Sequence, residues 1–216
     1  MTSGYIEQTA YFVKERLRNA EAGHDWWHIQ RVWNNVRHLL RCEQADQLIC
    51  ELAALLHDIA DSKFHDGDET LGPAIAGEFL RSIGVESHVV NHVRDIILNM
   101  SYKASLGNVT FHSRELAIVQ DADRLDAIGA VGIARAFHYG GFKNRALYDP
   151  SIPPQPGQSK EAYKNSTAPT INHFYEKLLL LKDKMNTDTA KRIAEERHAF
   201  MERYLDQFYR EWEGNQ

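Results

Sequence analysis

Apolar side chains recur every three or four positions along most of the chain, the spacing of one face of an α-helix. The first three segments of this kind carry the stripes Ile6, Ala10, Val13 and Leu17, then Ile29, Val32, Val36, Leu39 and Leu40, then Leu48, Leu52, Leu55, Leu56 and Ile59. The same spacing predicts helices over about residues 73–83, 86–101, 113–138, 170–185 and 187–212. We therefore expect a mostly or entirely α protein.

Alternating strand patterns are nearly absent from the sequence. The one candidate, residues 108–111, is too short to found a sheet. A long interruption of the helical pattern lies between Tyr139 and Pro169, where Gly140-Gly141 is followed by several prolines. A loop of this length, about residues 140–169, is typical of a lid, a binding loop or a disordered strip. Because we find no internal repeat and no linker, we expect an all-α, single-domain helical bundle over residues 1–216.

Composition narrows the function classes. Of the 216 residues 43% are hydrophobic and 25% charged, which is typical of a globular protein, and the formal net charge is −5. That balance argues against dedicated duplex nucleic-acid binding. Apolar runs such as residues 178–181 are too short to cross a membrane. Cys42 and Cys50 are expected to be buried thiols of a reducing compartment, so we expect a cytoplasmic protein with no membrane partner.

A histidine stands on the inward face of the second predicted helix. Asp25 suits the position just before that helix, and His28 falls in line with Val32 and Val36. An imidazole on a buried face needs a polar partner. The alternatives are a metal ligand and a core histidine bonded to a neighbouring group.

A second polar group ends the next predicted helix. His57 and Asp58 follow a strongly apolar run, and Asp61 and Lys63 come directly after them. One alternative is a helix end whose polar side chains bond the backbone. Burying this group in apolar surroundings without a compensating ion would be costly.

Three carboxylates, Asp121, Asp123 and Asp126, lie in a further segment that is otherwise apolar. Apolar residues line up with Asp121 as well as they do with Asp123, so periodicity does not choose between these two. A divalent cation would compensate all three polar groups of the sequence together.

In their order along the chain, His28, His57-Asp58 and Asp123 resemble the signature of the HD superfamily of metal-dependent phosphohydrolases. The flanking residues make the resemblance specific, above all Asp25-Trp26-Trp27-His28 and Ala122-Asp123-Arg124-Leu125. The likeness is to the small, single-domain bacterial branch of the superfamily, and it covers nearly the whole chain.

This resemblance implies one divalent ion held by His28, His57, Asp58 and Asp123. It favours Asp123 over Asp121, which becomes a supporting or structural residue. Two imidazoles and two carboxylates suit an octahedral ion, so we expect Mn²⁺ or Mg²⁺, with Fe²⁺, Co²⁺ or Ni²⁺ as alternatives.

A second ion bound by His88 and His92 is an alternative to the single ion, but a polar helix face explains that pair better. The sequence does not fix the oligomeric state.

The implied reaction is hydrolysis of a phosphoester or phosphoanhydride in a nucleotide or another small phosphorylated metabolite. A narrower expectation is release of pyrophosphate from nucleoside triphosphates. Asp61 is expected to take the proton of the attacking water, unless it is an ordinary carboxylate at a helix end. We expect Lys63, Lys103 and Arg124 to bind the phosphates. The alternative is a non-catalytic nucleotide-sensing or protein-binding module that retains the HD fold and the metal.

Overall fold

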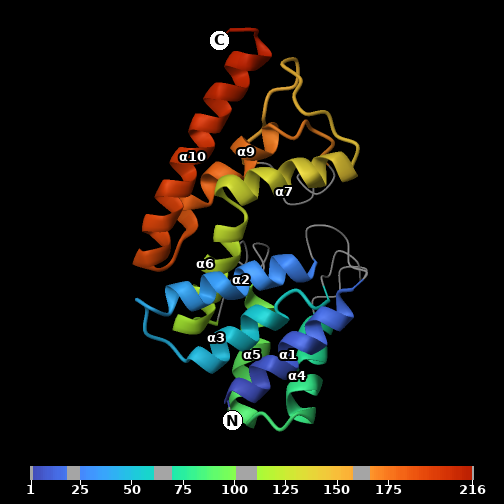
Figure 1. Ribbon diagram of the computed structural model, residues 1–216, viewed down its shortest axis with the longest axis vertical. Coiled ribbons are helices and arrows are strands. Elements are labelled where there is room, and N and C mark those ends of the chain that lie inside the picture. Colours follow the sequence, from blue (N-terminus) through green and yellow to red (C-terminus); the bar gives the residue numbers. More distant parts are fainter. Residues whose placement is uncertain (1, 19–24, 61–69, 101–110, 158–165, 216) are drawn as a thin grey trace. The chain divides into compact units, whose positions relative to one another are not determined.

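The computed structural model describes residues 2–18, 25–60, 70–100, 111–157 and 166–215 (Figure 1). All regular secondary structure in these ranges is helical, which confirms the predicted all-α class. By its internal contacts the chain divides into two compact units, Met1–Asp123 and Arg124–Gln216, which we describe one at a time. The expectation of a single domain stays a prediction.

The first unit is built around one central helix. Its elements are α1 (Thr2–Arg16), α2 (Trp26–Leu39), α3 (Gln47–Leu56), α4 (Leu71–Ser82), α5 (Ser87–Asn99) and most of α6 (Arg114–Asp126). Helix α3 contacts α1, α2 and α5, and α4 packs against α5. Residues 52–56 of α3 have no exposed surface. Because α3 is apolar on almost all sides, the other helices cover it, and its C-terminal end brings His57 to the edge of the core.

Glu51 is a charged residue buried within this core. Glu51 of α3 is only 3% exposed. Its carboxylate accepts hydrogen bonds from Trp33 Nε1 and from Gln47 Nε2, each at 2.6 Å, and lies 3.5 Å from Arg37 Nε. The buried charge is thus compensated from α2 and from its own helix.

Helix α2 begins and packs as the sequence predicts. Asp25 is extended, and its side chain accepts the backbone N–H of His28 at 2.9 Å, so it caps the helix. The apolar stripe from Ile29 to Leu39 is buried. This stripe fixes which face of α2 meets the core and therefore where His28 points.

The second unit contains α7 (Gly129–Phe142), α9 (Asn172–Glu176), two 3₁₀ turns, η3 (Leu178–Leu180) and η4 (Lys182–Lys184), and the long α10 (Asp188–Trp212). Helix α10 contacts α7 and η4. The fully buried ring of Phe174 lies 6.0 Å, between centroids, from both Phe137 and Tyr204. An aromatic cluster therefore joins α7, α9 and α10.

The predicted helix over residues 113–138 is wrong at its centre. Helix α6 ends at Asp126 and α7 begins at Gly129, with Ile128 extended between them. Gly129 has a φ of 76°, and a Cβ there would lie 3.0 Å from Cγ of Arg197. The left-handed backbone requires glycine and starts a new helix direction.

Two further boundaries differ from prediction. The expected helix over residues 170–185 is replaced by α9, η3 and η4, because the backbone leaves helical geometry at Lys177, where φ is −144°. The expected loop from residue 140 begins only after Phe142, where α7 ends.

The described parts of the long loop are tied together. Thr170 and Ile171 donate their N–H groups to the carbonyl oxygens of Ala146 and Leu147, at 2.9 and 3.0 Å. Arg145 donates to the carbonyl oxygen of Ser166 at 2.6 Å. Residues 158–165 of this loop and residues 108–110 of the strand candidate lie outside the described residues, and Phe111 is not in a strand. A lid role of the loop stays a prediction.

Both cysteines are free thiols. Cys50 is buried in α3, and this burial raises its pKa well above the usual range. Cys42 is exposed, so the expectation that both thiols are buried is wrong for Cys42, which follows the end of α2. None of the described helices combines the length and the hydropathy needed to cross a membrane.

Candidate metal centre

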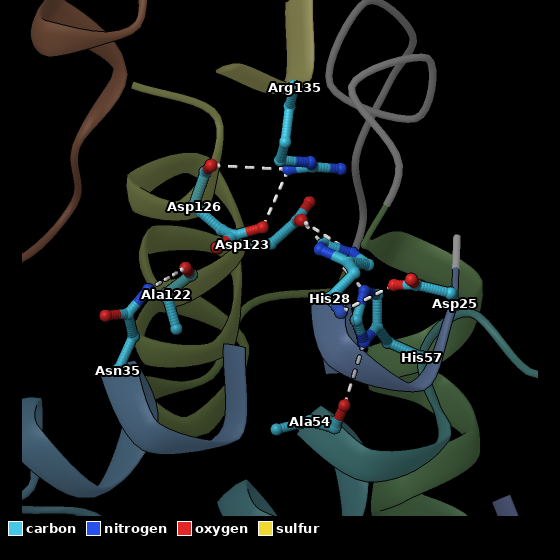
Figure 2. A network of polar contacts seen from close by, with 9 residues as sticks. All are labelled: Asp25, His28, Asn35, Ala54, His57, Ala122, Asp123, Asp126 and Arg135. Carbon is cyan, nitrogen blue, oxygen red and sulfur yellow. Dashed lines mark hydrogen bonds and ion pairs between the residues drawn. The ribbon is translucent and has the colours of Figure 1, made fainter. Parts of the chain in front are cut away.

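His28, His57 and Asp58 come together in the first unit. Each offers a ligand atom, and these atoms all lie within 4.8 Å of one another. The side chains of His28 and His57 are 3% and 6% exposed, and their ring centroids are 5.3 Å apart. Figure 2 shows the two rings next to each other, one from the start of α2 and one from the end of α3.

The ring of His57 is oriented by the backbone of its own helix. Its Nδ1 atom lies 2.8 Å from the carbonyl oxygen of Ala54. A carbonyl oxygen only accepts hydrogen bonds, so Nδ1 carries the proton and donates it to Ala54. The lone pair is then on Nε2, the nitrogen that lies nearer the carboxylate of Asp123.

Asp123 supplies a carboxylate at the same place. Its Oδ1 atom lies 3.5 Å from Nε2 of His28 and 4.0 Å from Nε2 of His57. The Asp123 side chain is 39% exposed, whereas Asp121 has no exposed surface. The accessible carboxylate of Asp123 therefore faces both rings, and its role as the fourth ligand in place of Asp121 stays a prediction.

These distances fit a small divalent ion. Ligand atoms that each lie about 2.1 Å from an octahedral ion are about 3.0 Å apart when adjacent and about 4.2 Å apart when opposite. The two distances to Asp123 fall between these values. Two imidazole nitrogens and carboxylate oxygens are also donors that divalent transition metals accept. The cluster could hold a metal ion.

Three of the four residues expected to act on the substrate lie outside the part of the chain that the structure describes. Asp61, Lys63 and Lys103 lie outside the described residues. Arg124, in the second unit, donates a guanidinium N–H to the carbonyl oxygen of Lys184. That contact attaches η4 to the end of α6, and a role of Arg124 in phosphate binding stays a prediction.

His88 and His92 have separate partners. His88 is exposed and lies 3.3 Å from Glu86 on the surface. Nε2 of His92 lies 3.0 Å from Oγ of Ser113 and 3.5 Å from the carboxylate of Glu115. The described contacts agree with a polar helix face at this pair.

One polar residue near the cluster has no counterpart in the sequence predictions. Asn35 of α2 donates from Nδ2 to the carbonyl oxygen of Ala122 at 3.0 Å, one residue before Asp123 (Figure 2). Its position in the sequence could have indicated a role. Asn35 stands seven residues after His28, on a helix whose inward face is otherwise apolar.

Comparison with known proteins places the chain in a family. The HD-domain family profile matches residues 26–128, which include all four residues of the cluster. The uncharacterized protein YpgQ of Bacillus subtilis is 40% identical over 210 residues, which cover 96% of this chain and 94% of YpgQ. The chain belongs to the HD-domain family.

Solved structures that are similar to this chain match it over nearly its whole length. An HD-superfamily hydrolase from Bacillus thuringiensis has 44% identity and a TM-score of 0.78, with 99% of each chain covered. The structure of Bacillus subtilis YpgQ in complex with ADP has 38% identity and a TM-score of 0.76, covering 98% of this chain and 97% of YpgQ.

Proposed function

We propose that this HD-domain protein is a metal-dependent phosphohydrolase that cleaves a phosphoester or phosphoanhydride bond in a nucleotide or a small phosphorylated metabolite. The observation that supports it is the convergence of His28, His57 and Asp58 within 4.8 Å, with Asp123 facing both rings. Membership of a family whose solved relatives include HD-superfamily hydrolases supports the same reaction class.

The four side chains would hold one divalent ion, for which we propose Mn²⁺ or Mg²⁺. When bound, such an ion makes water more acidic and neutralises charge on a phosphate oxygen. The chain's own contribution is orientation. The Asp25 cap fixes the turn that carries His28, and the carbonyl of Ala54 fixes the His57 ring. Asp61 remains the proposed acceptor of the water's proton.

We propose a nucleoside triphosphate as substrate, with release of pyrophosphate. The ADP complex of YpgQ supports a nucleotide, because that relative matches nearly the whole chain. The net charge of −5 does not oppose an anionic substrate, because a bound divalent cation would neutralise the negative charge of Asp58 and Asp123 locally, and the proposed phosphate-binding residues Lys63, Lys103 and Arg124 would add positive charge. We further propose a cytoplasmic location, in keeping with two free thiols.

A substrate screen tests this function. Purified protein with Mn²⁺ is incubated with nucleoside triphosphates, other nucleotides and phosphorylated metabolites, and released phosphate and pyrophosphate are measured. Asp58→Ala removes a proposed ligand, and Asp95→Ala removes an exposed carboxylate of α5 as a matched control. We expect release by the wild type and Asp95→Ala and at least a hundredfold loss in Asp58→Ala.

Two results would contradict the proposal. Asp58→Ala with the activity and metal content of the wild type would show that the site is elsewhere. Tight nucleotide binding without turnover, with every metal tried, would instead support the nucleotide-sensing alternative.

A further inference from the structure

Helix α2 contacts α6 at two neighbouring points of the first unit. Nδ2 of Asn35 donates to the carbonyl oxygen of Ala122 at 3.0 Å, and Nε2 of His28 lies 3.5 Å from the carboxylate of Asp123. Figure 2 shows both contacts, with Asn35 and His28 approaching the same turn of α6 from two places along α2. One contact holds the backbone of that turn, and the other faces its carboxylate.

The spacing of Asn35 and His28 makes the two contacts part of one helix face. They are seven residues apart, which is about two turns of an α-helix. Between them, Ile29 and Val32 are fully buried and hold that face against the core. A rigid, packed helix therefore fixes the position of the Asn35 amide relative to the His28 ring.

The turn that carries Asp123 needs support because it lies at the end of α6. The helix ends at Asp126. Beyond it, the backbone hydrogen bonds join residues three apart in place of four, with Ala127 and Ile128 donating to the carbonyl oxygens of Arg124 and Leu125. Terminal turns fray more readily than the middle of a helix. A donor from outside the helix limits this motion at Ala122.

We propose that Asn35 is a positioning residue of the metal centre, whose amide holds α6 at Ala122 and so places the Asp123 carboxylate against His28 and His57. This inference rests on the proposed function. Asn35 acts through the backbone and touches neither ion nor substrate.

The tolerance of metal sites sets the expected size of the effect. Ligands must be held within about 0.5 Å of their working positions. One residue of helix rises about 1.5 Å, so a shift of α6 by half a residue along its axis, about 0.75 Å, exceeds that tolerance. Groups that orient metal ligands typically contribute about 10-fold to 100-fold in metal affinity. We expect about a 10-fold effect for a contact that acts through the neighbouring residue.

The test compares substitutions on consecutive residues of α2. Asn35→Leu keeps the branched shape and the number of side-chain heavy atoms and removes the amide donor, whereas Asn34→Leu makes the same change at an exposed position. Trp33→Phe removes a hydrogen bond from α2 to Glu51, away from the cluster, and controls for general loss of stability. The dissociation constant for Mn²⁺ is measured by titration, the bound Mn²⁺ spectrum by electron paramagnetic resonance, and metal-free unfolding by denaturant.

We expect Asn35→Leu to bind Mn²⁺ about 10-fold more weakly, with a changed spectrum, while Asn34→Leu and Trp33→Phe keep the wild-type affinity. An affinity within twofold of wild type in Asn35→Leu would overturn the proposal, as would equal weakening in a Trp33→Phe variant of equal stability. If Asn35→Leu does not fold, Asn35→Ala is judged by the same criteria. A wild-type protein that binds no Mn²⁺ would overturn the proposed function and the role of Asn35 with it.

Discussion

The Oδ1 atom of Asp123 lies 3.5 Å from Nε2 of His28, and the same oxygen lies 4.0 Å from Nε2 of His57. Both distances exceed those of good hydrogen bonds. A single carboxylate oxygen thus faces two imidazole nitrogens without closing on either. This spacing suits three atoms that share a cation.

The pair Asp123 and Asp121 gives a direct prediction for the metal centre. Asp123→Asn should weaken Mn²⁺ binding at least 10-fold with little effect on unfolding, because the side chain is 39% exposed and faces the two rings. Asp121→Asn should keep the Mn²⁺ affinity but destabilise the protein by about 1–3 kcal/mol, because the carboxylate is fully buried. Calorimetric titration and urea unfolding measure the two effects, and the reverse assignment would show that Asp121 is the ligand.

In the second unit, Arg135 and Asp126 form a pair whose loss should be costly. Nη1 of Arg135 lies 2.7 Å from the carboxylate of Asp126, which is 2% exposed (Figure 2). Arg135→Ala should destabilise the protein by about 3 kcal/mol, because it leaves a buried carboxylate without this partner. Urea unfolding of both single variants and of Arg135→Ala with Asp126→Ala gives the coupling. Additive losses, within about 0.5 kcal/mol, would mean that the pair contributes nothing of its own.

The protein should become less stable as the pH is lowered, because His173 is buried. Burial lowers the pKa of His173 from its usual 6.5 to about 3, and Lys177 and Arg145 act in the same direction. Between these two values the unfolded chain binds a proton that the folded protein does not. The contribution of His173 to the free energy of unfolding is therefore fully present above pH 6.5 and is lost as the pH falls toward 3. At pH 5 the loss is up to about 2 kcal/mol.

The variant His173→Gln should flatten the dependence of the unfolding free energy on pH between 7 and 5. His88→Gln, at an exposed histidine, is the matched control and should keep the wild-type slope. Equal slopes in the wild type and His173→Gln would contradict the assignment to His173.

The helices that carry His28 and His57 were predictable from the sequence, because the capping residue and the apolar stripe indicate the same helix there. Asp25 caps α2, and the stripe that includes Val32 and Val36 is buried as predicted. His28 belongs to that stripe, so its inward position followed from periodicity alone. The apolar run of α3 likewise predicted a central helix that ends at His57.

The second unit was harder to predict because its turns depend on contacts between distant residues. The apolar pattern continues through Ile128, so only the φ of Gly129 in the fold reveals the break between α6 and α7. The side-chain amide of Asn172, at the start of α9, donates to the carbonyl oxygen of Ile152 at 2.9 Å across the loop. Helical periodicity does not register such contacts.

At the cluster, the sequence predicted residue types and order but not the supporting contacts. Periodicity did not separate Asp121 from Asp123, and the family resemblance favoured Asp123. The structure places the accessible carboxylate of Asp123 3.5 Å from His28 and buries Asp121, while the choice of ligand stays a prediction. The acceptor for His57 is the carbonyl of Ala54, a backbone atom that every residue carries. Asn35 was missed because a single asparagine on a helix is usually a surface residue.

Anomalous diffraction from crystals grown with Mn²⁺ tests the central claim most directly. We expect one Mn²⁺ peak at about 2.2 Å from Nε2 of both His28 and His57, with oxygens of Asp58 and Asp123 completing the protein ligands. A peak bound by other residues, or no peak at this cluster in crystals that hold Mn²⁺ elsewhere, would contradict the account.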